Sequence, residues 1–267
     1  MAGGRRPGVV DHVCMTASGS EEMAGLEARL AGLEQPGEVI QAAGLWMAGR
    51  LAAGGFRWLR SRKVLERRAA GRRETISVQP SRWNRTGGPV ELQIDSLNVR
   101  DSGLRDWRRA NQARTVVRGE VQDDWVCRGD MHLLRSWPVP GIPEDGHLFD
   151  AHAILTRPQN RVTRLDELCD RLLETAVPWF ASTADPGRLA GEVDDLTLAF
   201  DALELVELAV SRDEAGQARA LVERFVALGP EKRDAFERGK ELAYRGERPR
   251  WHDPAAMGWS SIVLGLG

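Results

Sequence analysis

The sequence predicts an α+β fold, in which an antiparallel sheet packs on flanking helices and a small C-terminal α-helical module follows. Apolar residues recur at helical spacing up to about residue 53, alternate at strand spacing from about 56 to 99, and return to helical spacing after 161. The strands succeed one another without helices between them, which indicates hairpins rather than parallel crossovers. We therefore expect a disordered tail over 1–19, an α+β domain over 20–184 and a helical module over 185–267.

Two helices are expected ahead of the sheet. Leucines spaced at i, i+4 and i+7 from Leu26 predict a short first helix that ends at Pro36. A second apolar stripe predicts a helix from about Glu38 to Ala53. Gly54 and Gly55 then supply the left-handed backbone that commonly ends a helix.

The next stretch alternates between apolar and polar residues. Residues 56–65 and 75–79 are expected to be extended, and 90–99 forms a further strand. The apolar positions of this last run change parity after Ile94, which predicts a bulge at Asp95–Ser96. Two more strands are predicted over 114–121 and 147–155.

The last third of the chain predicts helices joined by short connections. A helix that begins near Arg161 is expected to end at Pro178, because proline interrupts the backbone hydrogen bonds of a helix. Three further apolar stripes follow at helical spacing between about 188 and 246, and Gly246 provides a C-terminal stop. Short links between amphipathic helices predict antiparallel packing.

Composition limits the possible functions. The chain has 267 residues and a net charge of −2, so it has no overall attraction to nucleic acid or anionic lipid. Its cysteines, Cys14, Cys127 and Cys169, lie far apart without a CxxC pair, which argues against disulfides and zinc knuckles. The longest uncharged apolar run, 39–49, is too short to span a bilayer. These features predict a cytoplasmic protein without membrane partners, and no motif indicates a cofactor.

Four segments carry a family resemblance. They are Gly55-Phe56, ISVQPSRWN at 76–84, VELQIDSLNV at 90–99 and LCDRLLETAVPWF at 168–180. Together they resemble a bacterial family known as domain of unknown function 4304 (DUF4304), over roughly residues 38–182. The resemblance implies an α+β fold without an established activity, and it brings no catalytic residues.

A polar, tryptophan-bearing segment follows the strand at 75–79. Gln79 and Asn84 could donate and accept hydrogen bonds from a ligand, with Ser81 nearby and Trp83 as a stacking surface. The alternative is that these residues only make a turn between two strands. We favour the turn and keep binding as the second interpretation.

Charge is unevenly distributed along the chain. Residues 57–73 contain eight basic residues and Glu66 as their one acidic residue, which could bind phosphate or an acidic protein. Because no known nucleic-acid-binding motif occurs, nucleic-acid binding is the less favoured interpretation. Residues 185–214 are acidic, and Asp194, Asp195 and Asp201 could meet a cationic partner protein.

One cluster could support catalysis. On the strand predicted at 147–155, Asp150 and His152 would point the same way, with His147 close by, as in a metal site or an acid–base pair. Histidines with an ordinary structural role are the more common explanation, so no metal site is predicted.

The sequence thus favours a non-catalytic protein-interaction or binding domain, with an immunity-protein-like role as one form. The alternatives are an enzyme of unrecognised type that uses His147, Asp150 and His152, and a nucleic-acid-binding protein that uses residues 57–73.

Overall fold

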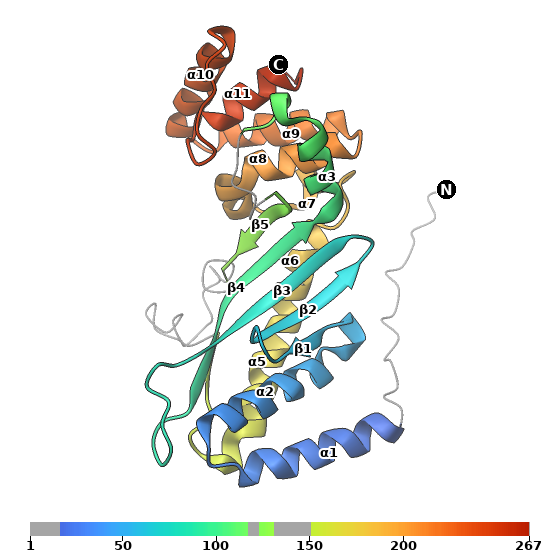
Figure 1. The fold of residues 1–267 in the computed structure, drawn as a ribbon, viewed down its shortest axis with the longest axis vertical. Helices are drawn as coiled ribbons and strands as arrows, with labels where there is room; N and C mark the ends of the chain where they lie inside the picture. The colour runs from blue at the N-terminus through green and yellow to red at the C-terminus, as the bar shows by residue number, and fades with distance from the viewer. Residues whose placement is uncertain (1–16, 117–122, 131–150, 267) are drawn as a thin grey trace, which may run out of the picture.

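The computed structural model describes residues 17–116, 123–130 and 151–266 (Figure 1). Its strands are β1 (Arg57–Leu59), β2 (Val64–Ala69), β3 (Arg72–Pro80), β4 (Glu91–Asp101), β5 (Trp125–Gly129) and β6 (His152–Ile154). Its helices are α1 (Ala17–Gly32), α2 (Pro36–Arg50), α3 (Ser102–Ala110), α5 (Arg161–Arg171), α6 (Val177–Ser182), α7 (Leu189–Glu192), α8 (Asp195–Ser211), α9 (Ala215–Ala227), α10 (Pro230–Tyr244) and α11 (Ala256–Val263). The predicted α+β class is confirmed.

The sheet is antiparallel throughout. Strands β1 to β4 pair in chain order, so each is joined to the next as a hairpin. The far edge of β4 pairs with β6 near its start and with β5 near its end. The bulge predicted at Asp95–Ser96 is confirmed, because Ser77 pairs with Ser96 whereas Val78 pairs with Ile94.

The two faces of the sheet differ in what covers them. Leu65, Ile76 and Leu97 are neighbours on three strands and are fully buried. Helices α5 and α6 lie behind the sheet in Figure 1, and α2 contacts β1, β2 and α5. Phe56 packs on Phe180 of α6 with ring centroids 5.8 Å apart. The alternate residues of β2 to β4 point the other way, where no described helix covers the central strands. We call this second side the open face.

The helix that begins at Arg161 does not end at Pro178, contrary to the prediction. Between α5 and α6 the backbone widens into a π-helical turn over Leu172–Ala176, and Pro178 lies in the first turn of α6. Proline lacks an N–H and its ring crowds the preceding turn, so a local widening lets the chain stay helical. Periodicity alone does not reveal this adjustment.

The region after β4 also differs from prediction. Residues 102–110 form α3 and residues 112–114 a 3₁₀ turn, so the strand expected over 114–121 does not begin at Arg114; residues 117–122 lie outside the described residues. Of the strand predicted at 147–155, the described part forms β6. At the N-terminus, residues 17–19 of the predicted tail belong to α1, and the rest of that tail lies outside the described residues.

The C-terminal helices form the predicted helical module, and α8 lies at the edge of the sheet. Helices α8, α9, α10 and α11 each contact the next, and α8 lies against β5 and α3. The carboxylate of Asp201 accepts hydrogen bonds from the backbone N–H of Arg128 (2.9 Å) and from the indole of Trp125 (3.3 Å). In the described part of the chain, no helix combines the length and hydrophobicity that crossing a bilayer requires.

Candidate anion-binding site on the open face

Three arginines lie side by side across the open face. In the strand register, Arg68 of β2 is opposite Arg73 of β3, and Arg73 is opposite Arg100 of β4. We call these three residues the arginine row. Like charges placed directly opposite each other in a sheet are destabilising. A row of three arginines therefore needs negative charge close by, which makes it a candidate site for binding an anion.

A two-residue turn sets the first pair of this row. Ala70 and Gly71 join β2 to β3 and both have positive φ, at 46° and 83°. Such a turn fixes the register of a hairpin and so places Arg68 opposite Arg73. The start of α3 is tied to the same turn, since the backbone N–H and the hydroxyl of Ser102 both donate to the carbonyl of Gly71.

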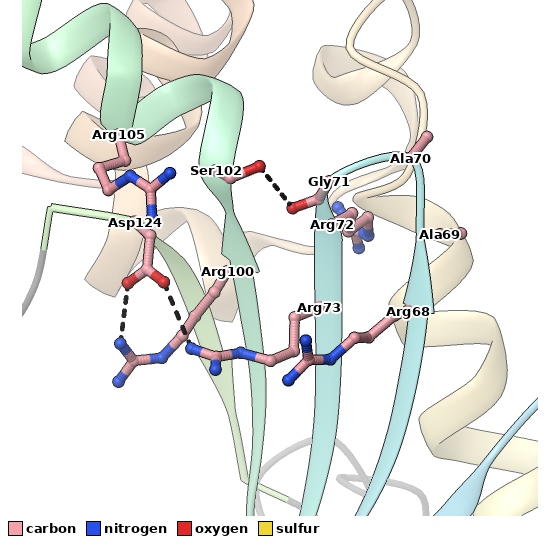
Figure 2. A pocket seen from close by; sticks show the side chains of 10 residues that line it. All are labelled: Arg68, Ala69, Ala70, Gly71, Arg72, Arg73, Arg100, Ser102, Arg105 and Asp124. Carbon is pink, nitrogen blue, oxygen red and sulfur yellow. Dashed lines mark hydrogen bonds and ion pairs between the residues drawn. The ribbon is translucent and has the colours of Figure 1, made fainter.

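Asp124 lies between two members of the row (Figure 2). Its carboxylate accepts hydrogen bonds from Arg100 Nη1 at 2.8 Å and from Arg73 Nη2 at 3.3 Å. Arg108 of α3 holds the segment that carries Asp124. Its Nη1 donates to the carbonyls of Asp123 and Trp125, each at 2.8 Å. One carboxylate is thus already bound where an anion would bind.

The row borders a pocket of about 360 Å³. Arg105 of α3 lines the same pocket, and Asp124 is the one carboxylate among its described lining residues. Arg72 also borders the pocket, but its side chain lies on the helix-covered face of β3. There its guanidinium donates to Glu74 and to the carbonyls of Phe180 and Thr183. Four other arginines therefore line the pocket with Asp124, and two of them are also paired elsewhere, Arg68 with Glu66 and Arg105 with Asp106.

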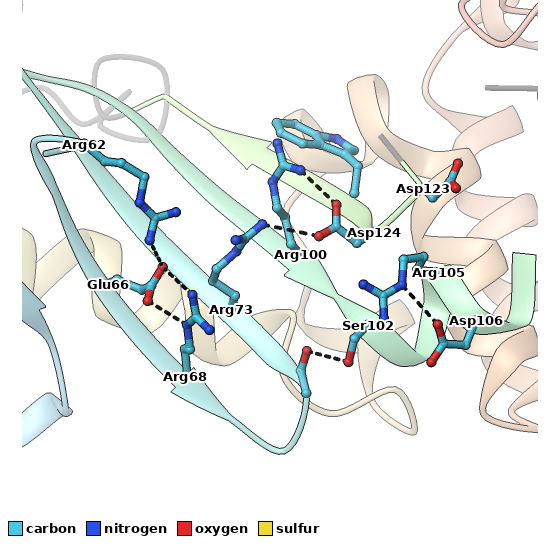
Figure 3. A network of polar contacts seen from close by, with 12 residues as sticks. Arg62, Glu66, Arg68, Arg73, Arg100, Ser102, Arg105, Asp106, Asp123 and Asp124 are labelled. Carbon is cyan, nitrogen blue, oxygen red and sulfur yellow. Dashed lines mark hydrogen bonds and ion pairs between the residues drawn. The ribbon is translucent and has the colours of Figure 1, made fainter. Parts of the chain in front are cut away.

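Glu66 balances part of the basic segment that the sequence indicated (Figure 3). Its fully buried carboxylate pairs with Arg57, Arg62 and Arg68, at 3.2, 2.7 and 2.6 Å. Figure 3 shows the last two of these pairs. Burial alone would raise the pKa of Glu66, but hydrogen bonds from these guanidiniums outweigh it and lower the pKa from 4.5 to about 2. The segment 57–73 is thus partly neutralised, and Arg68 of the row is one of the residues that Glu66 balances.

The low pKa of Glu66 predicts a pH dependence of stability. Because the folded-state pKa lies below the unfolded one, the ion pairs stabilise the fold fully above pH 4.5 and lose this contribution as the pH falls toward 2. The exposed arginines limit it to on the order of 2 kcal/mol. Urea unfolding of the wild type and Glu66→Gln should differ most near neutral pH and converge in acid. A difference between the wild type and Glu66→Gln that stays constant with pH would contradict this assignment.

Arg73 is the member of the row whose pKa is lowered. Burial lowers its pKa, Asp124 opposes that effect, and the nearby charges of Arg100 and Arg62 lower the pKa further. A bound anion would offset this repulsion. The site is therefore suited to holding negatively charged oxygen atoms.

The residues predicted to bind near Trp83 form two groups. Asn84 is a turn residue, since its side chain donates to the carbonyl of Glu91 and accepts from its N–H, both at 2.8 Å. The Ser81 hydroxyl accepts from the backbone N–H of Trp83 at 3.2 Å. These contacts agree with the favoured interpretation of the segment as a turn. Gln79 and Trp83, together with Ser81, line a second hollow on the open face.

His152 lines that same hollow. Its Nε2 lies 3.5 Å from the carboxylate of Glu91. His147 and Asp150, its predicted partners, lie outside the described residues. Within the residues that the structure describes, no three His, Cys, Asp or Glu side chains gather as a metal site would require.

The three aspartates proposed as an acidic surface do not share one. Asp194 caps α8 by accepting from the backbone N–H and the hydroxyl of Thr197, at 2.8 and 2.6 Å. Asp195 is exposed and forms an ion pair with Arg224. Asp201 is only 8% exposed and holds the edge of β5. The acidic composition of α8 thus reflects contacts within the protein more than an outer surface.

No known protein family, curated protein or solved structure matches this chain in sequence or structure comparisons. The resemblance to DUF4304 stays a prediction.

Proposed function

We propose that the protein is a non-catalytic binding protein whose open face holds a phosphate-bearing ligand at the arginine row. The observation that carries this proposal is the cross-strand register of Arg68, Arg73 and Arg100. Fold stability alone does not favour such a row, whereas a ligand with several negatively charged oxygens would use every member of it.

The chemistry of the pocket favours phosphate over a single carboxylate. Guanidinium groups present planar pairs of donors, and several of them around one site match the several acceptor oxygens of a phosphate group. The Asp124 carboxylate already occupies the position between Arg73 and Arg100, so an incoming anion must bring more charge or more acceptors to compete. A phosphate group meets both conditions.

The lining also supports binding rather than chemistry. Apart from arginines and Asp124, the described lining consists of Ala69, Ala70, Gly71 and Ser102. The Ser102 hydroxyl donates to Gly71, and the Asp124 carboxylate is held by two guanidiniums. Neither group is arranged to take up a proton from a substrate, which a general base must do.

Calorimetric titration with inorganic tripolyphosphate tests this function without involving any organic part of a ligand. We expect saturable binding that weakens with salt, and a loss of at least about tenfold in affinity for Arg73→Gln, because charge-assisted hydrogen bonds contribute about 1.5–3 kcal/mol each. Arg164→Gln removes the same charge from an exposed pair on α5 and should leave the affinity unchanged. Equal effects of the two substitutions would show that only net charge matters, and the proposal would be wrong.

A further inference from the structure

A second hollow lies on the open face, farther along the same strands. Gln79 of β3 is opposite Gln93 of β4, and Gln93 is opposite His152 of β6, so these three side chains form another cross-strand row. Together with Trp83 and Glu91 they line a space of about 300 Å³. Unlike the arginine pocket, this hollow has an aromatic ring and two neutral amides beside its charged residues Arg82 and Glu91.

Trp83 is unusually accessible for a tryptophan. Its side chain is 67% exposed, and the guanidinium of Arg82 lies over its ring at 4.7 Å from the centroid. Exposed tryptophans with a cation on one side are suited to stacking a flat ring on the other. The amides of Gln79 and Gln93 are joined by a hydrogen bond of 3.0 Å, and between them they can both donate to and accept from a neighbouring group.

A continuous polar strip connects the two sites. From Arg73 to Gln79, the open side of β3 carries Thr75 and Ser77 and spans about 20 Å at the rise of a β-strand. Beside it on β4, Asn98 donates to the hydroxyls of Ser77 and Ser96, at 3.4 and 3.1 Å. A linear ligand could therefore contact both sites along one face.

We infer that the ligand is a single-stranded nucleic acid, with its phosphates at the arginine row and a base stacked on Trp83. This inference rests on the proposed function and specifies its ligand. A distance of about 20 Å is compatible with the shorter sites of single-strand-binding domains, which cover from about four nucleotides. Such domains combine cationic groups that follow the backbone with aromatic rings that stack bases.

The charge of the second hollow separates this ligand from an acidic peptide. Glu91 and Arg82 both line the hollow and their charges offset each other, so the hollow offers a second carboxylate or phosphate much less attraction than the arginine row does. A neutral base needs no such attraction and can hydrogen-bond to the amides of Gln79 and Gln93. The two sites thus fit the alternation of charged backbone and neutral base in nucleic acid.

Fluorescence anisotropy with two labelled probes of equal charge tests the inference. One is a thymidine oligonucleotide of about 12 nucleotides, within the usual range of site sizes, and the other is an abasic strand of the same length. We expect the wild type to prefer the thymidine strand. Trp83→Leu should weaken its binding about tenfold and leave the abasic strand unaffected. Phe200→Leu, which removes an aromatic ring that is 74% exposed on α8, is the matched control and should change neither.

Arg73→Gln distinguishes the two levels of the proposal, because it should weaken binding of both strands. If Arg73→Gln weakens both strands but Trp83→Leu affects neither, the nucleic-acid inference is overturned and phosphate binding stands. If Arg73→Gln also has no effect, the proposed function itself fails. Displacement of the thymidine strand by an equally charged polyglutamate at the same concentration would indicate an acidic protein partner and would likewise overturn the inference.

Discussion

Replacing Arg108 by methionine should lower the free energy of unfolding by about 3–5 kcal/mol, because it leaves a buried carboxylate without its cation. Arg108 Nε donates to Glu207 Oε2 of α8 at 2.8 Å, and both side chains are at least 95% buried. The same guanidinium also holds the carbonyls of Asp123 and Trp125, so its loss removes the link between α3, α8 and the segment that carries Asp124.

Urea unfolding of three variants separates these contributions. Arg109→Gln changes the neighbouring arginine, which is exposed, and should alter stability by less than about 0.5 kcal/mol. The double variant Arg108→Met/Glu207→Leu replaces the pair by apolar groups and should recover much of the loss, as found for other buried pairs. A double variant less stable than Arg108→Met alone would show that the charge of Glu207 is not the source of the destabilisation.

Arg161→Met should have an effect of similar size for a different reason. The buried guanidinium of Arg161 donates to three backbone carbonyls: to Leu155 at 2.7 Å, to Leu30 at 2.5 Å and to Leu33 at 2.8 Å. It thereby joins the end of α1 to the strand–helix connection before α5. Without it, buried carbonyls lose their partners, and we expect a loss of about 3–5 kcal/mol in the free energy of unfolding.

The control for Arg161 is four residues earlier. Arg157 is exposed, so Arg157→Gln should leave the unfolding midpoint unchanged in the same urea titration. Hydrogen exchange should also show faster opening of the last turn of α1 in Arg161→Met. Protection of α1 equal to that in the wild type would indicate that the carbonyls of Leu30 and Leu33 do not depend on this side chain.

Much of the sheet could be predicted because its signals are local. The change of parity after Ile94 indicates a bulge, and the structure places one there. Gly55 has the positive φ of 77° that its place after the second helix predicts. Both features depend only on the pleat and on backbone sterics over a few residues.

The arginine row could not be predicted, because its members come together through pairing over long distances in the chain. Segment 57–73 contains Arg68 and Arg73, but its composition does not show that Arg68 pairs with Glu66 whereas Arg73 pairs with Asp124. Arg100 joins them only through the register of β3 with β4, which the bulge shifts by one residue. Asp124 reaches the row from the connection before β5, a strand that the sequence did not indicate.

The acidic residues of α8 illustrate the opposite error. A run of like charges usually marks a solvated face, yet Glu204, Glu207 and Asp201 are buried and have partners elsewhere in the fold. Those partners, Trp251, Arg108 and Trp125, are 47, 99 and 76 residues away. The number of charges along the chain could not show whether these carboxylates bind buried partners or face solvent.

The position of a bound tetrahedral dianion tests the central claim most directly. Tungstate resembles phosphate in shape and charge, and soaking it into crystals of the protein would locate it by its anomalous scattering. The proposed site requires a tungstate peak within hydrogen-bonding distance of the guanidiniums of Arg73 and Arg100, with the Asp124 carboxylate displaced. Tungstate ordered only elsewhere on the protein, with Asp124 still bound between the two arginines, would contradict the account.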